Sequence, residues 1–298
     1  MEKVIKLISQ LVTISKEYWK NVQGVTFTSN VNNSVLNFLR HIHYGKLGVN
    51  KTTSKKIDLP IDSWDIVLGP LDSSFINFVI NSKPKFLEDL NDYIGKSKDN
   101  PSKKDIKFNN MLIDLPHLAA TIEGYIASIT PDFWTGWGGD LSTLIGEITY
   151  KCANNKYNKA YKLLAINSVD TDGPTTFGNA DFYSDIDAIY ISQKLNNNFL
   201  DDIYKYYINK EYVNRKNIII NDIGYSGELS DRIYEKLTGS SGFKFLAIAG
   251  LQLKNLTKKY YDGEISHLVD YDEESVKACC QALAKKINEL GDNGILNF

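Results

Sequence analysis

Several features that usually reveal the class of a protein are scarce or missing in this chain of 298 residues. It has only three cysteines, Cys152, Cys279 and Cys280. An odd count does not make a disulfide framework, and adjacent cysteines in a helix cannot easily pair with each other. We therefore expect reduced, structural cysteines in a soluble protein that is made in the cytoplasm.

Long apolar runs and an excess of one charge are also missing. The apolar segments are far too short to span a bilayer, so no membrane insertion is predicted. The 34 Lys and Arg residues against 36 Asp and Glu residues give a formal net charge of -2, so no nucleic-acid partner is expected. Lysines interrupt the apolar pattern of residues 1–19, which predicts no Sec signal. If the protein is exported, we therefore expect it to use a specialised secretion system.

Three familiar catalytic or cofactor-binding patterns are absent as well. The chain has no Gly-x-Ser-x-Gly nucleophile elbow, no Walker loop and no dinucleotide fingerprint. It has only four histidines, which gives no support for a zinc site with several histidine ligands. No cofactor is therefore expected, and a protein partner cannot be specified.

Apolar residues at helical spacing predict a mainly α fold, a compact multi-helix globular protein with at most a minor strand component. The predicted helices cover residues 1–19, 30–43, 72–80, 85–94, 113–129, 141–152, 199–208, 227–237, 242–251 and 273–290. The segment Ile218-Ile219-Ile220 is the one predicted strand. We expect a single compact helical domain over residues 1–298, with a surface loop or sub-domain boundary at 95–107.

The first segment with chemical potential is Asp114-Leu115-Pro116-His117. In a helix over 113–129, His117 and Thr121 lie one turn apart beside the apolar stripe, whereas Glu123 lies on the opposite face and is expected to be solvated. Pro116 suits the first turn of a helix, with Asp114 as its cap. Asp114 and His117 are either a proton-donor pair or a helix cap and a core-edge hydrogen bond.

The second segment is Trp134-Thr135-Gly136-Trp137-Gly138-Gly139-Asp140. Three glycines permit a tight turn ahead of the next helix. The flat rings of Trp134 and Trp137 suit stacking on a sugar or an aromatic substrate. Asp140 is either the cap of that helix or a carboxylate of the site.

The third segment, Gly173 to Ala180, leads into Ser184-Asp185-Ile186-Asp187. This spacing resembles the signature of the nucleotidyltransferase superfamily, in which a Gly-Ser turn precedes an Asp-x-Asp pair. The resemblance implies that Asp185 and Asp187 bind Mg²⁺, with Asp222 as a third carboxylate after the predicted strand. Three departures from the signature are that Pro174 stands in place of the turn serine, that the preceding residues 168–172 are not an apolar strand, and that the apolar residues are spaced for a helix.

As a helix, the same segment places Asp181 and Asp185 one turn apart on one side. Asp114, His117 and Asp140 could then converge with them in one cleft. Neighbouring carboxylates repel, so one is driven to hold a proton while another stays ionised, which supplies an acid and a base. The same grouping could instead hold a divalent metal that activates water.

These observations favour a hydrolase with a carboxylate and histidine pocket. Asp140 or Asp185 is the predicted base or nucleophile, Asp114 and His117 are the predicted proton donors, and Trp134, Trp137, Thr121 and Asp181 are predicted to bind substrate. The tryptophans indicate a glycan substrate. The three segments together resemble a pattern found in bacterial effector-type and phage-associated proteins, which implies a toxin-like setting and a cell-wall target. The alternatives are the Mg²⁺-dependent nucleotidyltransferase and a non-enzymatic interaction protein.

Overall fold

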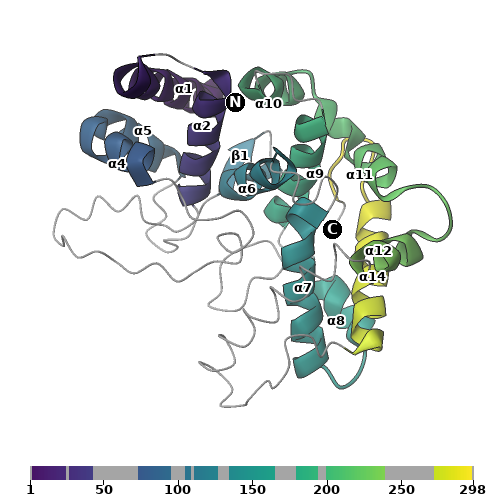
Figure 1. The fold of residues 1–298 in the computed structure, drawn as a ribbon. Helices are drawn as coiled ribbons and strands as arrows, with labels where there is room; N and C mark the ends of the chain where they lie inside the picture. The colour runs from purple at the N-terminus through teal and green to yellow at the C-terminus, as the bar shows by residue number, and fades with distance from the viewer. Residues whose placement is uncertain are drawn as a thin grey trace.

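The computed structural model describes residues 2–24, 27–42, 73–94, 105–108, 111–126, 134–164, 179–193, 199–238 and 272–296. These residues are mainly helical, as the sequence predicts (Figure 1). The elements of the first half are α1 (Glu2–Gln23), α2 (Thr28–Ile42), α4 (Ser73–Ser82), α5 (Pro84–Ile94), β1 (Asp105–Phe108), β2 (Met111–Asp114), α6 (Leu115–Ile126) and α7 (Trp134–Lys151). The elements of the second half are α8 (Lys156–Leu163), α9 (Asn179–Gln193), α10 (Phe199–Ile208), the 3-10 turn η1 (Glu211–Asn214), α11 (Arg215–Ile223), α12 (Leu229–Thr238) and α14 (Glu273–Asn288).

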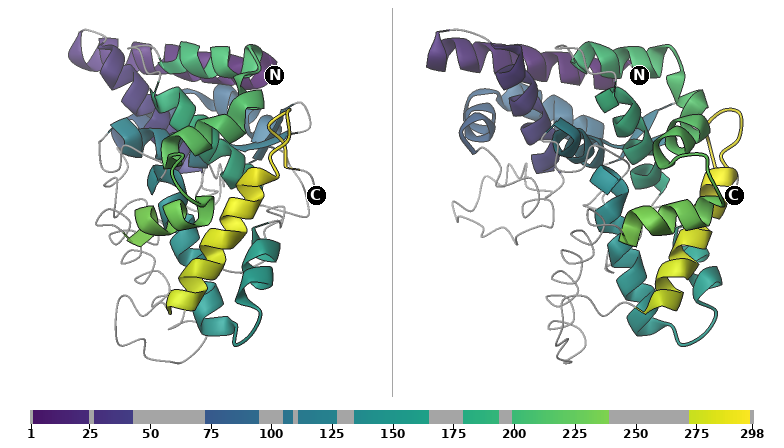
Figure 2. Two further views of the ribbon diagram at one scale, coloured as in Figure 1. Left: turned by 90° about the vertical axis from the view of Figure 1, so that its right-hand side faces the viewer. Right: turned by 45° about the vertical axis from the view of Figure 1, so that its right-hand side comes forward.

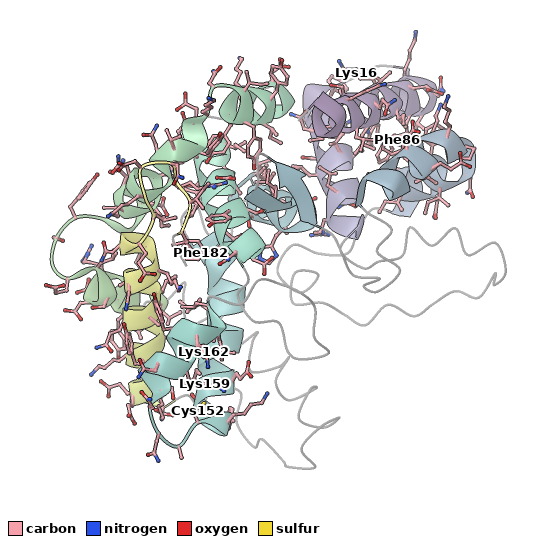
Figure 3. The ribbon with its side chains drawn as sticks, turned by 180° about the vertical axis from the view of Figure 1, so that it is seen from behind. Lys16, Phe86, Cys152, Lys159, Lys162 and Phe182 are labelled. Carbon is pink, nitrogen blue, oxygen red and sulfur yellow. The ribbon has the colours of Figure 1, made fainter. Side chains whose placement is uncertain are left out.

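The N-terminal helices α1, α2, α4 and α5 form one packed group (Figure 1). Leu7, Leu11 and Ile14 follow the helical repeat on one face of α1, and all three are buried. Phe86 of α5 is buried in the same group, whereas Lys16 of α1 is exposed to solvent (Figure 3). The apolar face of α1 therefore provides part of the core, and Lys6, Lys16 and Lys20 remain in water.

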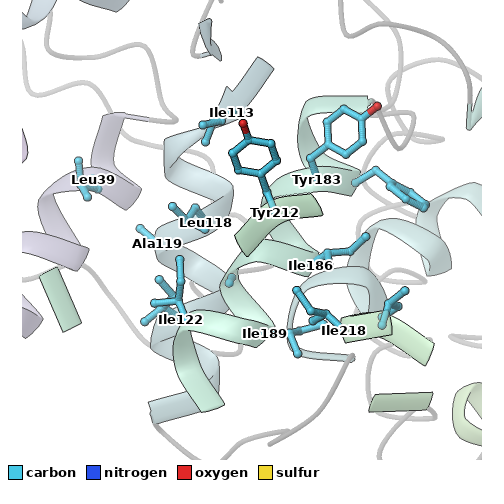
Figure 4. Close-up of a cluster of buried hydrophobic side chains, with 14 of the residues drawn as sticks. Leu39, Ile113, Leu118, Ala119, Ile122, Tyr183, Ile186, Ile189, Tyr212 and Ile218 are labelled. Atoms are coloured by element: carbon cyan, nitrogen blue, oxygen red, sulfur yellow. The ribbon is translucent and has the colours of Figure 1, made fainter. Parts of the chain in front are cut away.

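Helices α6 and α9 form the centre of the molecule, where α6 packs against both α9 and α2. Their apolar side chains interdigitate in one cluster, in which Leu118 and Ile122 come from α6 and Ile186 and Ile189 from α9 (Figure 4). Each pair is separated by three or four residues, the spacing that places two side chains on one helix face. The packing therefore fixes the rotation of both helices, and with it the positions of their polar side chains.

The C-terminal helix α14 packs against α7, α8 and α12 (Figure 2). Asp272 caps its first turn, because its carboxylate accepts hydrogen bonds from the Ser275 backbone N–H at 2.8 Å and from Lys156 Nζ at 2.7 Å. Burial alone raises the pKa of Asp272, but the hydrogen bonds from Lys156 and Ser275 outweigh it and lower that pKa. Cys279 and Cys280 are free and buried on the same helix, as predicted for structural cysteines.

Residues 218–220, predicted to form a strand, lie instead in helix α11. Ile218 and Ile219 are fully or almost fully buried there, so packing against the core overrides the β preference of consecutive isoleucines. The strands of the described residues are β1 and β2, an antiparallel pair that the sequence did not indicate. Strand β1 begins at Asp105, inside the segment predicted to be a loop or boundary at 95–107.

Two further predictions about local structure are wrong. Helix α7 begins at Trp134, so the glycines of residues 134–140 lie in its first turns and Asp140 does not cap it. Glu123 is not solvated, because its Oε2 lies 3.0 Å from Arg40 of α2 and its Oε1 accepts a hydrogen bond from Asn37. This ion pair joins α6 to α2.

The predicted helix 242–251 falls outside the described residues. Among the helices that the structure describes, none is both long enough and apolar enough to cross a membrane.

Candidate functional site

The histidine of the first segment lies between two carboxylates of the third. His117 is in the first turn of α6, and Asp181 and Asp185 are one turn apart on the facing side of α9. The Nδ1 atom of His117 lies 3.8 Å from Asp181 Oδ1, and its Nε2 atom lies 3.7 Å from Asp185 Oδ1. Each ring nitrogen therefore faces a different carboxylate.

A threonine fixes the deeper of these two carboxylates. Thr121, one turn after His117 on α6, donates a hydrogen bond from Oγ1 to Asp185 Oδ1 at 2.8 Å. The same Asp185 oxygen faces His117 Nε2. Thr121 therefore holds the carboxylate in the orientation in which it can align the imidazole, as a second group commonly does for a functional histidine.

Exposure differs between the two sides of the imidazole. The side chain of Asp185 is fully buried, the side chain of His117 is 7% exposed and that of Asp181 is 14% exposed. A reactant would consequently meet the Asp181 side of the ring before the Asp185 side. We refer to His117, Thr121, Asp181 and Asp185 as the α6–α9 polar cluster.

The ring can carry either one proton or two in this position. A neutral imidazole has one N–H and can donate to only one of the two carboxylates, whereas an imidazolium can donate to both. The protonation state of His117 therefore decides whether the ring turns an N–H toward one of the two carboxylates or toward both. Such a group can give a proton to a reactant and take one from it.

The structure thus brings together four of the residues predicted from the sequence, namely His117, Thr121, Asp181 and Asp185. For Asp114, Trp134, Trp137 and Asp140 it describes only the backbone. Asp114 ends β2 immediately before α6, and Trp134, Trp137 and Asp140 lie at the start of α7. Their side chains lie outside the described residues.

Asp187 serves a different part of the molecule, although it is only two residues from Asp185. Its carboxylate accepts hydrogen bonds from Arg215 Nε at 2.7 Å and from Arg215 Nη2 at 2.6 Å. The hydroxyls of Tyr206 and Tyr207 of α10 donate to the same carboxylate. All four side chains are buried, so this buried ion-pair cluster holds α9, α10 and α11 together.

The charges of this buried ion-pair cluster are mutually stabilised. Burial by itself lowers the pKa of Arg215, but the adjacent Asp187 carboxylate raises that pKa above its ordinary value. Burial and the Asp187 charge both raise the pKa values of Tyr206 and Tyr207 well above the ordinary one, so these hydroxyls stay protonated. Arg215 also donates from Nη1 to the Gly294 carbonyl at 3.2 Å, which ties the C-terminal segment to the same cluster.

This geometry disagrees with the nucleotidyltransferase prediction. Asp185 and Asp187 lie on a helix and not on a strand, so they face different neighbours, and the oxygens of Asp187 are occupied by Arg215 and two tyrosines. Asp222 lies on helix α11 and accepts a hydrogen bond from Gln193 Nε2 at 3.0 Å. The pair does not fit a Mg²⁺ ion, and within the described ranges no group of three or more His, Cys, Asp and Glu side chains is placed to hold a metal.

Sequence reasoning missed the partner of Asp187. In the Tyr204-Lys205-Tyr206-Tyr207 run of α10, Tyr206 and Tyr207 are buried whereas Tyr204 is 45% exposed. The available signal was the presence of one aspartate and one arginine in otherwise apolar helix faces, since a buried charge needs an opposite charge. Their separation of 28 residues in the sequence hid the pairing.

Comparison with known proteins gives one family and no activity. Residues 119–293 match the model of a family described as YkzU uncharacterised protein. Thr121, Asp181 and Asp185 lie within the matched residues, and His117 lies two positions before them. No curated protein and no solved structure matches the chain.

Proposed function

The chain belongs to the family of YkzU uncharacterised proteins, and we propose that it is a hydrolase whose acid–base centre is the α6–α9 polar cluster. The observation that carries the proposal is the position of His117, with a carboxylate facing each ring nitrogen at 3.7–3.8 Å. A histidine aligned by one carboxylate and adjacent to a second is an arrangement that can move protons during hydrolysis.

The exposure gradient suggests how the roles divide. Asp181, the most exposed of the charged groups in the cluster, is the ionised carboxylate that faces the reacting bond and takes a proton from the attacking water. His117 gives its proton to the leaving oxygen, and the proton that Asp181 took from water then passes to His117, so that both groups return to their starting state in each cycle. Asp185 and Thr121 act through His117 as positioning residues, because both are fully buried.

The proposed substrate class is a glycan of the bacterial cell wall. Glycoside hydrolysis requires a proton donor and an ionised carboxylate at one site, which His117 and Asp181 supply. Trp134 and Trp137, at the start of α7, give aromatic rings of the kind that stack on sugars. The setting we propose is that of an effector or toxin, made in the cytoplasm and exported by a specialised secretion system.

The test is hydrolysis of a defined polymer. Purified protein is incubated with isolated peptidoglycan sacculi, and the release of soluble reducing sugars is followed over time. We expect release by the wild type and its loss in the His117→Ala variant, with both proteins showing the same circular dichroism spectrum. No release by the folded wild type rejects the cell-wall substrate.

A matched experiment in cells tests the setting. The chain is expressed in a bacterial host with and without a Sec leader, and growth is followed in both strains. A cell-wall hydrolase should stop growth only from the periplasm, whereas equal growth from both compartments contradicts the proposed target.

Complete burial favours a second candidate function. Asp185 and Thr121 have no exposed surface and are hydrogen-bonded to each other. A buried hydrogen bond that joins two helices is equally expected in the core of a non-enzymatic interaction protein. In that case Asp185→Asn and His117→Ala change stability alone, and the sacculus assay detects no activity in any variant.

A further inference from the structure

The structure contains a groove that is separate from the α6–α9 polar cluster. It is an open depression of about 510 Å³ that is lined by residues of α8, α14 and the start of α12. Helix α14 packs against both α8 and α12 in this part of the molecule (Figure 2). Its lining includes Tyr157 of α8, Glu228 and Ser230 at the start of α12, and Gln281 and Asn288 of α14. A depression of this volume is large enough for a small-molecule ligand.

The aromatic side of the groove is held rigidly in place. The ring of Tyr157 stacks on that of Tyr161, with centroids 6.2 Å apart and planes inclined by 23°. Tyr161 in turn donates a hydrogen bond to Glu289 and lies beneath the ammonium groups of Lys285 and Lys286, at 4.4 and 4.1 Å from its ring centroid. Tyr157, which lines the groove, is thereby held in place and needs little reordering when a ligand binds.

The lining also offers unused hydrogen-bonding groups. Within the described part of the chain, the side chains of Glu228, Ser230, Gln281 and Asn288 donate to and accept from no other protein group. Together they provide two amides and a hydroxyl, which both donate and accept hydrogen bonds, and a carboxylate, which accepts them. Such a mixture suits a ligand that itself carries many hydroxyl or amide groups.

The charges of the lining argue against an anionic ligand. Glu228 and Glu289 contribute two carboxylates, and Lys285 is the lysine of the lining. Its ammonium group is already engaged, 3.9 Å from Glu289 and over the ring of Tyr161. A phosphate or carboxylate in the groove would meet more negative than positive charge.

A flat aromatic ring, amides, a hydroxyl and a net negative rim together describe a site for a neutral sugar. The apolar face of a sugar ring packs on an aromatic ring, while its hydroxyls bond the polar groups around it. We propose that this groove is a binding site for a neutral oligosaccharide, with Tyr157 as the stacking surface and Gln281 and Asn288 as hydrogen-bonding residues. This site does not depend on the catalytic proposal, because it shares no residue with the α6–α9 polar cluster.

The test is direct binding of neutral trisaccharides to the full-length protein. Triacetylchitotriose, cellotriose and maltotriose are titrated by calorimetry and examined by saturation-transfer NMR, with inorganic phosphate as the anionic probe. We expect at least one trisaccharide to bind and phosphate not to bind. Absence of binding by all three sugars at millimolar concentration, or displacement of a bound sugar by phosphate, overturns the proposal.

Variants then locate the binding. Gln281→Ala alters an exposed side chain and should weaken binding about tenfold, and Tyr157→Ala should weaken it by at least as much. Tyr204→Ala, which removes a 45% exposed tyrosine from α10, is the matched control and should bind as the wild type does. Because Tyr157 also packs on the core, the melting temperature of the Tyr157→Ala variant is measured alongside. If Tyr157→Ala unfolds, the affinity of Gln281→Ala alone tests the site. If both variants fold and both bind the trisaccharide with wild-type affinity, the assignment of the groove is contradicted.

The two proposals fail separately. The His117→Ala variant should lose hydrolysis of sacculi and keep trisaccharide binding. A protein that binds the trisaccharide but never cleaves sacculi would retain the oligosaccharide site and lose the catalytic proposal. A protein that cleaves sacculi without binding any trisaccharide would retain the catalytic proposal and lose the oligosaccharide site.

Discussion

Replacement of Asp187 by asparagine should destabilise the fold severely. The carboxylate is fully buried and accepts two hydrogen bonds from Arg215 and one each from Tyr206 and Tyr207. Asparagine keeps one acceptor oxygen and turns two N–H donors toward groups that themselves donate. It also leaves the charge of Arg215 buried without an opposite charge.

The expected magnitude follows from those losses. Removal of one partner of a buried ion pair costs about 3–5 kcal/mol. A hydrogen bond to a charged group contributes about 1.5–3 kcal/mol, and at least one such bond is lost here. We therefore expect Asp187→Asn to lower the free energy of unfolding by about 3–5 kcal/mol, which is a large part of the stability of an ordinary domain.

The assay is urea unfolding followed by circular dichroism. Asp292→Asn, at an exposed turn near the C-terminus, is the matched control and should change the free energy of unfolding by less than about 0.5 kcal/mol. The double variant Asp187→Leu with Arg215→Met removes both charges and should recover part of the loss. A loss below about 1 kcal/mol for Asp187→Asn would contradict a buried ion pair between Asp187 and Arg215.

Three further outcomes follow from individual contacts. Gly294→Ala should lower the free energy of unfolding by at least about 1 kcal/mol in urea, because φ is +67° and a Cβ atom would overlap the Tyr212 carbonyl; a neutral effect contradicts the described turn. Asp272→Ala should cost about 1 kcal/mol at pH 7. Since the folded-state pKa of Asp272 lies below its ordinary 3.8, that difference should shrink as the pH falls through 3.8 and below, and a constant difference contradicts the cap. Burial raises the pKa of Cys279, and that of Cys280 to about 12, so a thiol reagent should leave both unmodified in the native protein and react with both in urea.

The sequence allowed the helical class and part of the candidate site to be predicted, because both depend on local spacing. His117 and Thr121 share a face of α6, and Asp181 and Asp185 share a face of α9, through the same i, i+4 repeat that buries the apolar residues beside them. Once apolar packing brings the two helices together, their polar residues must meet. That these polar residues lie close together could therefore be predicted, although the distances between them could not.

Contacts between distant segments could not be predicted in this way. The pairing of Asp187 with Arg215 depends on how α9 and α11 approach each other, which no local pattern records. The contact of Glu123 with Arg40 joins residues 83 positions apart for the same reason. Neither pair could be predicted, because a helical pattern indicates on which face of its own helix a residue lies but not which other helix will cover that face.

Local propensity also misled where tertiary packing was stronger. Gly136, Gly138 and Gly139 indicated a turn, yet they are in helix α7, whose later residues Leu141 and Leu144 are fully buried. The cost of glycine in a helix, about 1 kcal/mol per residue, is small beside the burial of several apolar side chains.

If the α6–α9 polar cluster performs chemistry and does not merely fill the core, removal of the Asp185 charge should slow hydrolysis. The most direct measurement is the rate at which Asp185→Asn releases soluble sugar from peptidoglycan sacculi, compared with the wild type at equal folded concentration. Asparagine can still accept the hydrogen bond from Thr121 but removes the charge that faces His117, so the melting temperature should change little. We expect the rate of Asp185→Asn to be at least about 100-fold lower than that of the wild type. An unchanged rate in the folded variant, or a variant that only loses stability, would contradict it.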